Sequence, residues 1–156
     1  MRRAPVLFLA CVLLAGFTGC GAADGVSSGA TVSVYVAKPQ CAGALRELAR
    51  ANGRAGDVRV RAVCLRGAAS ENGWNLATIG ANARRASEDS TTVGYIAEPS
   101  PTPIRFSATI LDAAGIAQIS GASGSIAMST LLRAIRQAGD ASSLRESVRD
   151  ELGQAR

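Results

Sequence analysis

Histidine is absent from the 156 residues, and its absence removes several kinds of catalytic chemistry. Ser-His-Asp and Cys-His mechanisms need an imidazole to activate the nucleophile. The usual zinc sites that contain histidine are excluded for the same reason. The stretch GASGS at residues 121–125 lacks the lysine and the spacing of a phosphate-binding loop. We therefore expect no enzyme, no metal site and no cofactor.

Aromatic residues and lysine are also scarce, with six aromatics and a single lysine in the chain. The formal charge is +5, and setting aside Arg2 and Arg3 leaves 15 basic and 12 acidic residues, a charge of +3. Beyond residue 3, Arg84 and Arg85 are the only adjacent basic pair, so the sequence has no basic stripe. Nucleic acid is not an expected partner.

Long apolar runs are limited to residues 6–17. Arg2 and Arg3 precede this run, and small residues follow it up to Cys20, which is the tripartite pattern of a secretory signal. The run is too short to be a stable membrane span. We expect the protein to be exported.

The signal ends in Phe17-Thr18-Gly19-Cys20, which resembles the lipobox of bacterial lipoproteins. The resemblance implies lipidation at Cys20 and anchoring to the outer face of the cell membrane. The alternative is an ordinary signal peptide cut nearby, with an incidental cysteine. The predicted organisation is a signal peptide at residues 1–20, a flexible tether rich in Gly, Ser and Ala at 21–30, and a single α/β lobe at 31–156.

Strand-like and helix-like stretches alternate in that lobe. The strands are expected at residues 31–37, 57–65, 93–97 and 116–119, and the helices at 41–52, 74–87, up to Gly115, 125–138 and 142–154. Arg59 and Arg61 are costly to bury, so the second strand is expected at an edge. This pattern predicts a three-layer α/β fold with an open parallel sheet of about four strands in the order 2-1-3-4.

Apolar residues lie near the starts of two of the expected helices. Residues 66–73 read as a polar loop, and Trp74 is expected at the start of the second helix, over the core or, alternatively, stacked on a ligand. Leu76 and Ile126 lie in the apolar stripes of their helices and are expected to face the core.

Cys41 and Cys64 are the cysteines beyond Cys20. Cys41 begins the helix after the first strand, and Cys64 lies near the end of the second, neighbouring strand. Both therefore lie at one edge of the sheet, and in an oxidising compartment a disulfide is expected. The alternative is two buried thiols.

The sequences TVSVYVAKPQ, LRELARANGRAG, DVRVRAVCL, VGYIAEPS and FSATILDAAGIAQISGASG occur in this order. Together they resemble the amino-terminal lobe of type I periplasmic solute-binding proteins, in particular those that bind leucine, isoleucine and valine for ABC transporters. The resemblance covers Thr31 to about Ala138. Since that family closes two lobes on a ligand, it implies that this chain is a single-lobe or truncated form.

The resemblance also implies a ligand-binding site in the loops after the first, third and fourth strands. Gly121, Ala122 and Ser123 match the segment that holds the ligand carboxylate through backbone N–H groups and a hydroxyl. The other expected hydroxyl falls at Pro101, with Ser100 and Thr102 on either side, and Gln40 follows the first strand. The same residue types are also ordinary turn and helix-capping residues.

We therefore expect an extracytoplasmic solute-binding lipoprotein that holds an amino-acid-like solute. An ABC permease or a second lobe or chain would be its protein partner, and the lipid anchor would hold it at the membrane. The alternative is a surface lipoprotein that uses the lobe as a protein-interaction scaffold. An enzyme would need an acid/base pair, and Glu98 is the only carboxylate in the loops that follow the strands.

Overall fold

The computed structural model describes residues 31–121, 123–139, 141 and 143–154. The predicted signal peptide, the lipidation site at Cys20, the tether and Ala122 lie outside the described residues.

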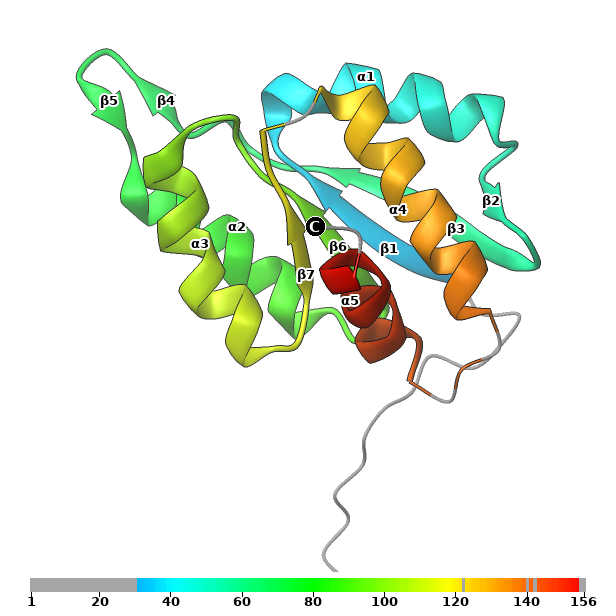
Figure 1. The fold of residues 1–156 in the computed structure, drawn as a ribbon. Coiled ribbons are helices and arrows are strands. Elements are labelled where there is room, and N and C mark those ends of the chain that lie inside the picture. The colour runs from blue at the N-terminus through cyan, green and yellow to red at the C-terminus, as the bar shows by residue number, and fades with distance from the viewer. Residues whose placement is uncertain (1–30, 122, 140, 142, 155–156) are drawn as a thin grey trace, which may run out of the picture.

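A five-stranded sheet forms the middle layer (Figure 1). Four parallel strands, β1 (Thr31–Val36), β3 (Val58–Cys64), β6 (Thr92–Ile96) and β7 (Ala117–Ile119), correspond to the four predicted strands, and their predicted order is confirmed. The fifth strand, β2 (Arg54–Ala55), was not predicted and pairs antiparallel with the start of β3. The sheet is therefore mixed, in the order β2-β3-β1-β6-β7, and β3 is an edge strand only beyond Arg59.

In the described part of the chain, five helices cover the two faces of the sheet: α1 (Lys38–Arg50), α2 (Leu76–Glu88), α3 (Pro101–Ala113), α4 (Gly124–Ala138) and α5 (Leu144–Gln154). Helices α1, α4 and α5 lie on one face, and α2 and α3 lie on the other (Figure 1). The result is a three-layer α/β arrangement, because each face of a sheet buried on both sides needs an apolar cover.

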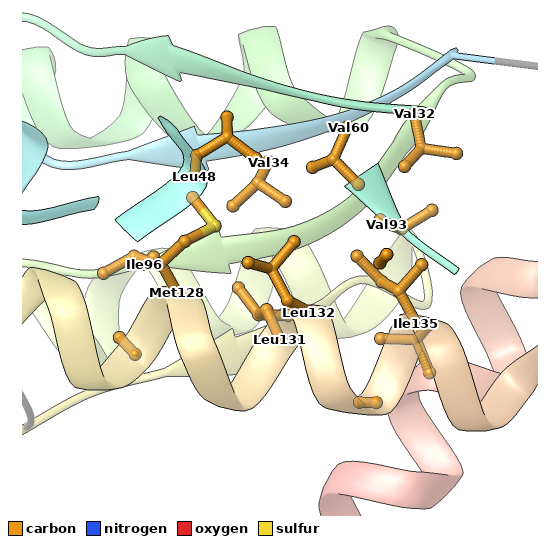
Figure 2. Close-up of a cluster of buried hydrophobic side chains, with 14 of the residues drawn as sticks. Val32, Val34, Leu48, Val60, Val93, Ile96, Met128, Leu131, Leu132 and Ile135 are labelled. Carbon is orange, nitrogen blue, oxygen red and sulfur yellow. The ribbon is translucent and has the colours of Figure 1, made fainter. Parts of the chain in front are cut away.

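The larger core cluster lies between the sheet and α4 (Figure 2). Val32 and Val34 point to this face because alternate residues of a strand share a side. Leu131 of α4 packs closely over Gly94 of β6, where an added Cβ would lie 2.6 Å from the Leu131 Cδ2. Here α4 contacts the sheet directly, without an intervening side chain on β6.

The amino-terminal edge of the sheet carries a polar network centred on Asp89. Its carboxylate accepts hydrogen bonds from the Tyr35 hydroxyl (3.1 Å), the Thr91 N–H (2.9 Å) and the Arg61 guanidinium (3.3 Å). Burial by itself raises the pKa of Asp89, but hydrogen bonds from Thr91, Tyr35 and Ser33 outweigh it and the pKa is lowered. The network ties the end of α2 to side chains of β1 and β3 and to the segment before β6.

Residues 66–74 differ from the prediction. Instead of a plain loop, they contain a small hairpin, β4 (Ala69–Ser70) and β5 (Gly73–Trp74), that projects from the domain (Figure 1). Trp74 belongs to β5, so its expected place at the helix start is wrong. The helix begins after Asn75, whose side chain accepts a hydrogen bond from the Thr78 N–H at 3.0 Å. This N-cap fixes the start of α2 two residues later than predicted.

Two side chains expected in the core are exposed. Leu76 is 42% exposed and Ile126 is 59% exposed. Both lie in the first turn of a helix, and the side chains that contact the core begin further along, at Ile79 and Ala127. Helical periodicity identifies the buried face, but it does not show where the helix passes beyond the sheet.

Candidate functional site

The carboxyl ends of the four parallel strands meet at one edge of the sheet, which we call the carboxyl edge (Figure 1). Three main-chain hydrogen bonds continue the pairing of the parallel strands past their ends. The Leu65 N–H donates to the Val36 carbonyl (2.9 Å), the Ala37 N–H to the Ile96 carbonyl (2.8 Å) and the Ala97 N–H to the Ile119 carbonyl (3.0 Å). The loops that follow these strands are therefore fixed side by side. Open α/β sheets bind ligands at such an edge.

Helix α4 starts against the first turn of α1. A Cβ on Gly124 would collide with the main-chain carbonyl of Gln40, and a Cβ on Gly43 would lie 3.0 Å from the Ser125 nitrogen. The Ser125 hydroxyl donates a hydrogen bond to the Gly43 carbonyl at 3.1 Å. The absence of side chains at both glycines lets the two helices approach closely. This contact brings Gln40, which is buried, next to the segment that contains Ser123.

Ser123 is the N-cap of α4, and its hydroxyl accepts a hydrogen bond from the Ile126 N–H at 3.4 Å. The residue is exposed, and the turn before it uses Gly121 at a φ of +80°, a conformation that favours glycine. Both residues thus have a structural role at this turn. They also place the amino-terminal end of a 15-residue helix, capped by the exposed Ser123, at the carboxyl edge.

Ser100 and Thr102 have different surroundings. Ser100 is the residue before α3 and makes no side-chain cap, while Pro101 occupies the first position of the helix. Thr102 is exposed and lines a groove between α2 and α3, together with Leu76, Arg105, Phe106 and Thr109. The structure therefore joins Gln40 to the α4 segment and places Thr102 in this separate groove.

Glu98 was not predicted as a ligand-binding residue, although it lies in one of the loops at the carboxyl edge. It is 6% exposed, and burial raises the pKa of its carboxyl group, while a hydrogen bond from the Ala68 backbone opposes this shift. This contact links the loop after β3 to the loop after β6. The sequence feature that could have indicated the burial of Glu98 is its position directly after an apolar strand.

A disulfide joins Cys41 and Cys64, with the two Cα atoms 5.7 Å apart, so the expected pairing is confirmed. It connects the first turn of α1 to the last residue of β3, at the carboxyl edge. The first turn of α1 is thereby attached covalently to the end of β3.

A cavity of about 320 Å³ lies beside β7, between α3 and α5. Ile104 and Asp112 line it from α3, and Arg149 and Leu152 line it from α5. Within the described part of the chain, no group of His, Cys, Asp and Glu side chains has the arrangement of a metal site. Over the same residues, no helix is both long and apolar enough to cross a membrane.

Comparisons with protein-family models, with curated proteins and with solved structures found no match.

Proposed function

We propose that the chain is an extracytoplasmic binding lipoprotein that holds a small amino-acid-like solute at the carboxyl edge. The amino-terminal end of α4, capped by the exposed Ser123 at that edge, is the observation that carries the proposal. The first turn of α4 has no acidic residue, and the positive end of its helix dipole favours a carboxylate. The close contact of Gly124 with Gln40 holds this end of the helix in place.

The proposal includes a second surface that closes over the solute. Pockets for small molecules normally enclose most of the ligand surface, and one open sheet edge provides only one side of such a pocket. A second lobe, another chain or an ABC permease would supply the other side. The resemblance to the amino-terminal lobe of type I solute-binding proteins gives the same expectation.

The second candidate function is a protein-interaction scaffold. The cavity beside β7 favours it, because apolar and oppositely charged side chains line the groove along the edge strand: Ile104, Leu152, Asp112 and Arg149. A partner chain that binds there would cover the edge of the sheet without any solute.

Calorimetric titration with a panel of amino acids tests the first candidate on the chain from Gly21 onward, which contains every described element. Ser123→Ala removes the N-cap of α4, and Asn75→Ala is the matched control because it removes the N-cap of α2. We expect saturable binding that Ser123→Ala weakens at least about tenfold, while Asn75→Ala leaves it unchanged; both lose about 1 kcal/mol of stability.

A folded domain that binds none of the amino acids would contradict solute binding. Equal loss of binding in both variants would assign the effect to stability and contradict the role of the α4 end. The scaffold function would then be tested by pull-down from an extract of the source cells.

A further inference from the structure

The groove between α2 and α3 lies outside the site proposed above. Thr102, Arg105, Phe106 and Thr109 line it from one side of α3, at the i, i+3, i+4, i+7 spacing of a single helix face, and Leu76 lines it from α2. Its volume is about 420 Å³. The opposite face of α3 is buried through Pro103, Ser107 and Leu111. Helix α3 is therefore amphipathic, with an outer face that is itself partly apolar.

Large apolar side chains are exposed in this groove. Leu76 is 42% exposed and Phe106 is 41% exposed. The Phe106 ring lies against Gly80 of α2, where an added Cβ would be 3.2 Å from its Cε1 atom. Trp74 is half-buried at the end of the projecting hairpin, two residues before Leu76. Apolar side chains thus lie on both helices and directly before α2.

Two arginines give the groove a positive charge. Arg105 lines it, and the Arg84 guanidinium lies 3.4 Å from the Cβ position of Gly80, the same point that Phe106 approaches. Among the described residues, the ion pairs are Arg50 with Glu47 and Arg61 with Asp89, so neither groove arginine is neutralised by a carboxylate. The first turns of α2 and α3 contain no acidic residue.

We propose that this groove docks on an anionic lipid surface. Phe and Leu side chains flanked by arginine are the combination that enters the boundary between headgroups and acyl chains while pairing with lipid phosphates. Lipid is favoured over an acidic protein because the proposed anchor at Cys20 holds the domain beside a bilayer. The inference rests on the proposed function in this respect alone and does not require solute binding.

Vesicle binding by the unanchored chain from Gly21 onward tests the proposal. The probes are vesicles of equimolar phosphatidylglycerol and phosphatidylcholine, compared with vesicles of phosphatidylcholine alone. Co-sedimentation measures partitioning, and the fluorescence of Trp74, the single tryptophan of the sequence, reports on the segment directly before α2, two residues from the groove residue Leu76. We expect binding to the anionic vesicles, a blue shift of the Trp74 emission, and weakening of both by salt.

Matched variants distinguish binding through the groove from nonspecific electrostatic and hydrophobic binding by the rest of the surface. Arg84→Gln and Arg105→Gln are each expected to weaken partitioning about fivefold, and Phe106→Ser is expected to abolish the blue shift. The controls Arg133→Gln and Ile126→Ser change exposed side chains on α4, on the other face of the sheet, and are expected to have no effect.

No binding to anionic vesicles, or equal losses in the groove and control variants, would overturn the lipid proposal. Amino-acid titration of the same preparation shows independently whether the solute site is intact, so the two proposals can fail separately.

Discussion

Arg145 of α5 donates a hydrogen bond from its Nε to the main-chain carbonyl of Thr92 in β6, at 2.8 Å. The same guanidinium also donates to the carbonyls of Ala114, Asp89 and Ser90 at 3.3, 3.2 and 3.0 Å. Burial lowers the pKa of Arg145, and Asp89 opposes the shift. One side chain thus attaches the last helix to the amino-terminal edge of the sheet.

Arg145→Met is expected to destabilise the fold by about 2–4 kcal/mol, because four carbonyl groups lose a charged donor. Urea denaturation followed by circular dichroism measures the change. The control is Arg149→Met on the exposed side of the same helix, for which we expect about 0.5 kcal/mol or less. Similar losses in the two variants would show that Arg145 does not hold α5 in place.

The close contact between α1 and α4 gives a second prediction. Gly124→Ala places a Cβ against the main-chain carbonyl of Gln40, which cannot rotate away as a side chain would. We expect a loss of about 1–3 kcal/mol, the usual cost of overpacking. Gly153→Ala in α5 is the control: a Cβ there meets nothing within 4 Å, and alanine should stabilise the helix slightly. A stable Gly124→Ala protein would mean that α4 can shift away from α1.

The pH dependence of stability tests the Asp89 network. The pKa of folded Asp89 lies below its ordinary value of 3.8, so the ionised carboxylate contributes stability. That contribution is fully present above the unfolded pKa and is lost as the pH falls through the folded pKa. Between about pH 5 and pH 2, the wild type should therefore lose more free energy of unfolding than Asp89→Asn. Parallel acid profiles for the two proteins would contradict this role.

The architecture was largely predictable because the parallel strands are apolar and rich in β-branched residues. Val32, Val34 and Val36 alternate along β1, and Arg59 and Arg61 marked β3 as the outermost parallel strand. The two-residue strands β2, β4 and β5 are too short to produce a period, so they were missed. The first turns of α2 and α4 were assigned to the core because periodicity ignores where the sheet ends.

The candidate site was predictable only at the level of its loops. Parallel topology alone brings the segments with Gln40, Ser100 and Ser123 to the same edge. The closeness of Gly124 to Gln40 depends on the packing of two helices that are far apart in sequence, and no local pattern encodes it. The outward position of Thr102 likewise follows from the rotation of α3 about its axis.

The network around Asp89 and the amino-terminal end of α4 lie at opposite edges of the sheet. Side chains that connect the strands to one another are concentrated at the first edge, whereas the second is joined mainly by main-chain hydrogen bonds and the Cys41–Cys64 disulfide. The strand register therefore does not depend on the exposed side chains of Pro99 and Ser120, which can be diversified. The domain is in this sense a suitable starting framework for selecting new binding specificities by loop randomisation.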